Sequence, residues 1–144
     1  MKNAHAIDEA RLGIMLNELR LPTIKTLWPQ FAEQADREGW PAARFLSAIA
    51  EHELAERANR RIERHLAEAH LPPGKTLDSF AFDAVPMISK AQVMAITAGD
   101  SWLAKGANIL MFGPPGGGKS HLAAAIGLAL IENGWRVLFT RTTD

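Results

Sequence analysis

Eight residues near the C-terminus, GPPGGGKS, constrain the fold more than any other part of this chain. They occupy positions 113–120, and Gly113, Gly116, Gly117 and Gly118 permit backbone torsions that side chains would forbid. Successive N–H groups in such a loop can turn inward and form a concave nest for an anion. The sequence therefore predicts a loop whose backbone is held open to a negatively charged ligand.

The segments around the loop predict a strand before it and a helix after it. Residues 108–112 are a nearly continuous apolar run, typical of a strand that is buried on both faces, and residues 136–140 predict the next strand. Residues 120–132 have a helix-forming composition, and Gly134 is expected to end that helix. The amides and dipole at the start of this helix would face the same anion as the loop. A phosphate group fits such a site.

The side chains of the loop predict nucleotide chemistry. We expect Lys119 to reach the β and γ phosphate oxygens as the catalytic point charge, and the Ser120 hydroxyl to bind a magnesium ion that bridges them. The predicted nucleotide-binding residues are Gly113, Pro114, Pro115, Gly116, Gly117, Gly118, Lys119, Ser120 and His121. The two prolines should stiffen the start of the loop.

The N-terminal half predicts helices. Apolar spacing favours one helix within residues 7–21, a second within 22–40 and a third, the longest, over about 41–69. Pro29 should kink or split the second helix, and Gly39 should cap it. A short helix is expected over 88–96. In the third helix the predicted packing face is a row of residues four apart, widened by Phe45 and Ile49: Leu46, Ala50, Leu54, Ala58, Ile62 and Leu66.

A group of arginines lies along the third predicted helix: Arg57, Arg60, Arg61 and Arg64. Glutamates are interleaved with them, so one interpretation is a solvated face with intrahelical ion pairs. The other is an edge that contacts phosphates and binds duplex DNA in a salt-sensitive, sequence-independent way. The forked guanidinium suits phosphate oxygens, which keeps the second interpretation open.

Composition restricts the remaining functions. Sixteen basic and sixteen acidic residues cancel, so no overall positive charge attracts nucleic acid or an anionic membrane. The chain has no cysteine, which excludes disulfides and thiolate metal sites, and its five histidines have no zinc-motif spacing. No apolar run approaches the roughly 20 residues that span a bilayer. We expect a cytoplasmic protein without membrane contact.

The chain resembles the N-terminal portion of IstB-like ATP-binding proteins, which belong to the AAA+ superfamily and are related to DnaC-type helicase loaders. The resemblance lies in LNELRLPTIK, FLSAIAEHELAERANRRIERHL, KTLDSFAF, LAKGANILMFGPPGGGKSHLAAAIG and GWRVLFT. It implies an α/β fold with three parts. These are a helical partner and DNA interaction domain over 1–72, a linker with a lead-in helix over 73–107, and over 108–144 the start of an AAA+-type P-loop domain with a parallel sheet, truncated after its second strand.

The resemblance also implies a function in insertion-sequence transposition. Members use ATP and Mg²⁺, and the full-length form is an ATPase that self-associates on duplex DNA and directs the transposase of the same element to a target. This sequence departs from the family at Gly117, where threonine is usual, at Ser120, where threonine is frequent, and at Pro29.

The family's Walker B carboxylates, sensor and arginine finger have no counterpart in residues 1–144. We therefore expect a fragment that binds nucleotide weakly and hydrolyses little. In the family's strand order two further strands would separate the two predicted here, unless these pair directly through a right-handed crossover. Two alternative functions remain, a DnaC-like helicase loader and a non-catalytic interaction module.

Overall fold

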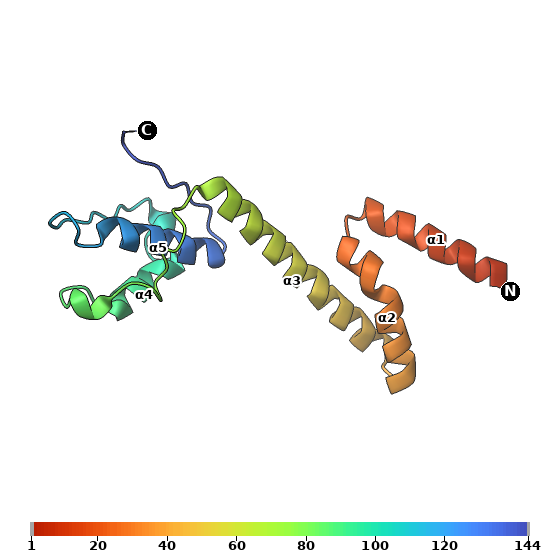
Figure 1. Ribbon diagram of the computed structural model, residues 1–144. Helices are drawn as coiled ribbons and strands as arrows, with labels where there is room; N and C mark the ends of the chain where they lie inside the picture. The colour runs from red at the N-terminus through yellow and green to blue at the C-terminus, as the bar shows by residue number, and fades with distance from the viewer. Residues whose placement is uncertain (1, 144) are drawn as a thin grey trace. The chain divides into compact units, whose positions relative to one another are not determined.

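The computed structural model describes residues 2–143, which belong to two compact units, Met1–Asn59 and Arg60–Asp144. The helices are α1 (Lys2–Glu18), α2 (Pro22–Glu38), α3 (Ala42–Ala69), α4 (Lys90–Ala98) and α5 (Lys119–Glu132), with 3₁₀ turns η1 (Phe82–Ala84) and η2 (Leu103–Lys105) (Figure 1). The division between the units falls inside α3, ahead of the predicted boundary after residue 72. Within the described range, no helix has the length and apolar character needed to cross a bilayer.

Local sequence signals set several helix ends. Gly39 ends α2 in the left-handed conformation, at φ 67°, and the N–H of the next residue, Trp40, donates to Ala35 O. These features confirm the predicted cap. Pro29 lies inside α2, which nevertheless runs from Pro22 to Glu38 as one helix rather than two. In the second unit, the Ser89 hydroxyl caps α4 by accepting a hydrogen bond from Gln92 N–H.

A buried carboxylate organises the first unit. Glu53, on α3, is only 3% exposed, and its Oε2 accepts a hydrogen bond of 2.9 Å from Ile24 N–H in the first turn of α2. The residue before α2, Leu21, offers no side-chain acceptor, so Glu53 takes that capping role from a distant helix. Arg57, one turn further along α3, lies 3.7 Å from Glu53 Oε1 and donates to Arg20 O at 2.9 Å. These bonds hold α3 to the connection between α1 and α2.

The predicted packing face of α3 is confirmed at Ile49 but is wrong for the leucine row in the first unit. Leu46 and Leu54 are 61% and 65% exposed, whereas Ile49 is 2% exposed and Glu53 is buried beside it. Residues four apart share a helix face, so turning Glu53 towards the start of α2 also turns Ile49 inward. The same rotation carries the leucine row out to solvent.

The core of the second unit lies between the linker, α4 and α5. It contains Phe80, Val93, Leu122, Ile126 and Leu130. Other faces of α5 are also covered, because Ala124, Ala125 and Ile131 are at most 1% exposed. A helix that is apolar and buried on most sides belongs to the interior of its unit. α5 is therefore the central element of residues 60–143.

The predicted parallel sheet is a wrong prediction. No strand occurs among residues 2–143, and neither 108–112 nor 136–140 pairs with a neighbouring strand. Leu110 and Phe112 are 75% and 85% exposed, although the apolar run had suggested burial. A strand is completed by the backbone hydrogen bonds of a neighbour, and Phe139 N–H instead donates to Ala69 O at the end of α3. The described fold is thus helical rather than α/β.

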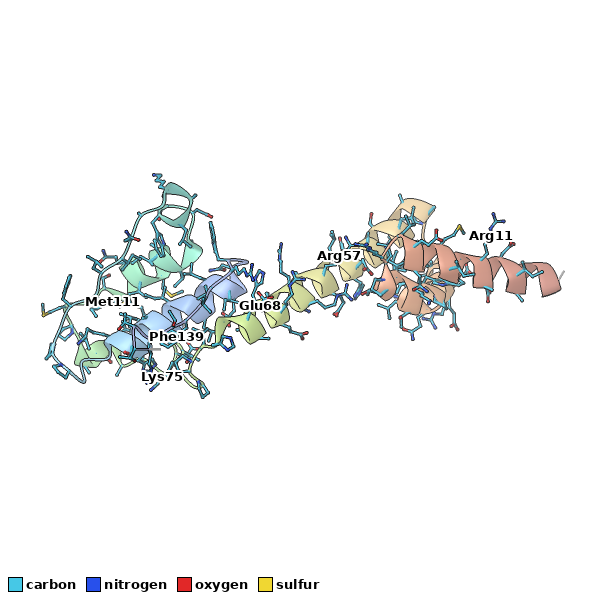
Figure 2. All side chains as sticks on the ribbon, turned by 90° about the horizontal axis from the view of Figure 1, so that it is seen from above. Arg11, Arg57, Glu68, Lys75, Met111 and Phe139 are labelled. Atoms are coloured by element: carbon cyan, nitrogen blue, oxygen red, sulfur yellow. The ribbon has the colours of Figure 1, made fainter. Side chains whose placement is uncertain are left out.

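A side-chain ion pair supports the same connection to the end of α3. Arg136 is three residues before Phe139, and its Nε lies 3.0 Å from Glu68 Oε2. Glu68 and Phe139 are labelled in Figure 2. Both contacts lie within the second unit. They fix the segment that follows α5 beside the last turn of α3 without any sheet.

Side chains that follow α4 and side chains that follow α5 donate hydrogen bonds to the C-terminal carbonyls of α4. Trp102 Nε1 donates to Ile96 O at 2.9 Å, Asn133 Nδ2 to Thr97 O at 2.8 Å, and Trp135 Nε1 to Ala98 O at 2.9 Å. The last carbonyls of a helix have no partner within the helix, so each of these bonds takes the place of a hydrogen bond to water. Asn133 and Trp135 follow α5, and they therefore tie the end of α4 to the end of α5.

Two glycines allow a test of this junction. Gly99 and Gly106 both have left-handed backbones, at φ 80° and 68°, but a Cβ on Gly99 would overlap Trp135 Nε1, whereas a Cβ on Gly106 would meet nothing within 4 Å. We expect Gly106→Ala to lower the free energy of unfolding by about 1 kcal/mol, from backbone strain alone. Gly99→Ala should lower it by about 3 kcal/mol, because Trp135 must also move. Urea unfolding followed by circular dichroism measures both, and equal losses would contradict the described junction.

Candidate phosphate-binding site

The loop at 113–120 forms a tight turn that leads directly into α5. Gly116 and Gly118 adopt φ values of 79° and 84°, which glycine tolerates best, and Gly117 N–H donates to Pro114 O at 3.2 Å. A Cβ on Gly117 would also lie 3.2 Å from that oxygen, tighter than most such contacts. Glycine at position 117 therefore suits the turn described here.

The start of α5 is open to a ligand. Its N-cap residue, Gly118, has no side chain that could accept a hydrogen bond, and the first helical bond runs from Leu122 N–H to Gly118 O at 2.9 Å. The amides of Lys119, Ser120 and His121 precede this bond, so the helix itself gives them no acceptor. Together with the helix dipole they favour an anion at this end.

Lys119 places its charge inside the loop. The half-buried ammonium donates to Gly113 O at 2.6 Å and to Pro114 O at 2.8 Å. An ammonium has three donors, so these two bonds leave capacity for a further acceptor. The cation thus joins the start of the loop to its end, and an incoming phosphate would add to or replace its bonds to the carbonyls.

Ser120 and His121, two other predicted contact residues, have different surroundings. Ser120 is exposed at the second position of α5, as a magnesium-binding hydroxyl would need to be. His121 instead turns towards the linker, with Nε2 3.0 Å from Ser79 Oγ and 3.1 Å from Thr76 O. The role of each in nucleotide binding stays a prediction.

Sequence reasoning missed the part of the linker that contacts the loop. Phe80 is 8% exposed, and one of its ring carbons lies 3.0 Å from where a Cβ on Gly118 would stand. Thr76 and Ser79 share hydrogen bonds in which each backbone N–H donates to the other's hydroxyl at 3.1 Å. The spacing of a threonine and a serine three residues apart could have indicated this local turn.

A cavity of about 620 Å³ opens beside the loop within the second unit. Its walls come from residues 84–96, from the extended segment 109–112 and from α5, and they are mostly apolar. Lys119 and Gln92 are the long polar side chains that line it, and Gly117 and Gly118 border it. Small-molecule sites commonly have this size and this mixture of apolar walls with few polar groups.

The four arginines proposed for DNA contact differ in their surroundings. Arg57 is engaged with Arg20 O and Glu53 inside the first unit (Figure 2). Arg60, Arg61 and Arg64 belong to the second unit and are exposed on α3. The geometry therefore supports a structural role for Arg57, and the DNA role of all four arginines stays a prediction.

This difference predicts unequal effects on stability. Arg57→Ala should lower the free energy of unfolding by about 1 to 2 kcal/mol, because it removes a charged donor from Arg20 O and the cation beside buried Glu53. Arg64→Ala, at an exposed position of the same helix, should change it by less than about 0.5 kcal/mol. Thermal unfolding of the two variants beside the unmodified chain tests this, and a similar loss in both would rule out the role of Arg57.

Comparison with known proteins shows which family this chain is similar to. The IstB-like ATP binding protein family matches residues 14–144. An insertion sequence ATP-binding protein of Sinorhizobium fredii is 94% identical over 145 aligned residues, which cover 100% of this chain and 49% of the relative. The IS5376 ATP-binding protein of Geobacillus stearothermophilus is 33% identical over 93% of this chain and 53% of its own length. The IS21 counterpart of Pseudomonas aeruginosa is 34% identical over 89% and 48%.

The chain spans about half the length of these relatives. The family match nevertheless extends over nearly the whole chain and includes both the glycine loop and the three N-terminal helices, in part or in full. It confirms the resemblance drawn from the sequence. This chain belongs to the IstB-like ATP binding protein family.

Proposed function

We propose that this chain binds ATP at residues 113–120 and serves an insertion-sequence transposition system. The observation that carries the proposal is that the uncapped start of α5 and the Lys119 ammonium, which is bonded to Gly113 O and Pro114 O, both belong to the glycine loop. Both groups favour a polyphosphate. The relatives are named as ATP-binding proteins, which supports adenine as the base.

In this proposal, different groups of the loop bind the phosphate oxygens and the magnesium ion. Backbone amides from Lys119 to His121 donate to phosphate oxygens, and Lys119 exchanges a carbonyl of the loop for a β or γ oxygen. The ammonium thereby exchanges a neutral carbonyl acceptor for an anionic oxygen, so that both partners of the bond are charged. The exposed Ser120 hydroxyl fits a magnesium ion, which would neutralise charge on the phosphates when bound. The neighbouring cavity leaves room for the remainder of the nucleotide.

The wider function follows from the family. We propose that the chain is the ATP-binding part of a helper that acts with the transposase of the same element on duplex DNA, and that the longer form self-associates. The named relatives are insertion-sequence proteins, which favours this role over a helicase loader. Exposed Arg60, Arg61 and Arg64 are the proposed DNA-contacting residues.

Nucleotide binding is tested by removing the ammonium. Lys119→Ala should weaken MgATP binding about 10- to 100-fold, because it deletes a charged donor worth about 1.5 to 3 kcal/mol. Lys105→Ala, at an exposed position of the same unit, should bind like the unmodified chain. Isothermal titration calorimetry gives the three affinities. Undetectable binding by the unmodified chain, or equal binding by Lys119→Ala, would refute the proposal.

DNA binding is tested through its dependence on salt. Replacing Arg60, Arg61 and Arg64 together by glutamine should reduce the slope of log affinity against log salt concentration by about 0.9 for each phosphate that is no longer neutralised. Exposed Arg11 and Arg37, in the first unit, provide control replacements that should leave the slope unchanged. Fluorescence anisotropy with a labelled random duplex measures the slopes, and an unchanged slope in the triple variant contradicts the proposed contacts.

A further inference from the structure

We infer that His121 is a positioning residue of the phosphate site, which acts by holding the first turn of α5 against the linker. The inference rests on the proposed ATP binding at residues 113–120. It concerns three side chains, Thr76, Ser79 and His121, which we call the latch. None of them needs to contact the ligand for the latch to affect its affinity.

The contacts of His121 indicate which of its ring nitrogens is the donor. Nε2 is 3.1 Å from Thr76 O and 3.0 Å from Ser79 Oγ. A carbonyl oxygen can only accept, so the bond to Thr76 requires Nε2 to carry the hydrogen. The ring is thereby a donor to the linker, across 45 residues of sequence.

The linker side of the latch is itself held in place. Thr76 N–H donates to Ser79 Oγ and Ser79 N–H to Thr76 Oγ1, each at 3.1 Å, and Ser79 Oγ also lies 3.1 Å from Gly74 O. His121 thus bonds to a closed turn rather than to a single freely rotating hydroxyl. A bond to an ordered partner costs less conformational entropy than one to a mobile side chain.

The next residue of the linker braces the other side of the site. The Phe80 ring packs on Gly118 and meets the His121 ring edge-on, with centroids 5.4 Å apart. Ser79 and Phe80 therefore hold His121 and Gly118, the residues on either side of Lys119 and Ser120. The two residues expected to contact phosphate and magnesium lie between these fixed points.

This arrangement should raise affinity by preorganisation. Ligands bind more tightly when the groups that receive them are already ordered, because less entropy is lost on binding. Loss of the latch would keep Lys119 and Ser120 and their ability to reach the ligand. It would loosen the turn that orients their backbone amides. The expected signature is weaker nucleotide binding in a chain that remains folded.

Two replacements of His121 separate its donor from its ring. His121→Phe keeps an aromatic ring beside Phe80 but has no N–H, whereas His121→Gln places an amide N–H near the position of Nε2. We expect His121→Phe to weaken MgATP binding about five- to tenfold, and His121→Gln to stay within about twofold of the unmodified chain. Calorimetry is run at 25 °C, with circular dichroism to establish that each variant is folded.

Ser79→Ala tests the latch from its exposed side, where a folding defect is least expected. It should weaken binding, but less than His121→Phe, because the bond from Nε2 to Thr76 O remains, and the double variant should be no weaker than His121→Phe alone, since both changes act on the same connection. Ser101→Ala, an exposed serine of the same unit, should bind normally. If His121→Phe does not fold, Ser79→Ala decides the matter.

The outcomes separate this inference from the proposed function. An unmodified chain that fails to bind MgATP overturns both. If Lys119→Ala abolishes binding but Ser79→Ala and His121→Phe bind normally, the ATP site stands and the latch is refuted, even if their melting temperatures fall. A weak His121→Gln beside a weak His121→Phe refutes the donor role of Nε2, and an effect of His121→Phe without one of Ser79→Ala refutes the coupling through the linker.

Discussion

The backbone amides in the first turn of α5 have no acceptor within the helix, and the packing of the second unit is arranged around this open helix end. They need an acceptor, and the structure supplies none from the N-cap because Gly118 has no side chain. The surrounding residues instead stabilise the turn from its sides, with Phe80 on Gly118 and the linker on His121. Burial of α5 along its length then keeps this uncapped end in place. The proposed anion site and a packed core are therefore built from the same helix.

Both units meet the needs of helix ends with side chains from distant parts of the chain. Glu53 supplies an acceptor to the start of α2, and Trp102, Asn133 and Trp135 supply donors to the end of α4. Each contact satisfies a backbone group that would otherwise need water. Tertiary structure in this protein is thus specified by polar contacts at helix ends as much as by apolar packing.

Periodicity and capping signals predicted the helices well, because these are local properties. The limits of α2, α3 and α5, the cap at Gly39 and the loop before Lys119 could all be read from neighbouring residues. The sheet could not, since a strand exists only through its partner and residues 108–112 have none in the described part of the chain. The orientation of α3 was missed because a buried glutamate, rather than the leucine row, decides which side faces inward. The latch joins residues 45 apart, beyond any local pattern.

The crowding of α5 has a mechanical consequence. A Cβ added to Gly127, near the middle of the helix, would lie 3.3 Å from both Leu71 and Val137, so the helix has little space in which to slide or rotate alone. Close-packed interiors transmit displacement instead of absorbing it. A small movement of Lys119 would therefore displace the whole of α5, together with Asn133 and Trp135, which follow its C-terminal end. Because these two side chains bond to the last carbonyls of α4, the displacement would reach the last turn of α4.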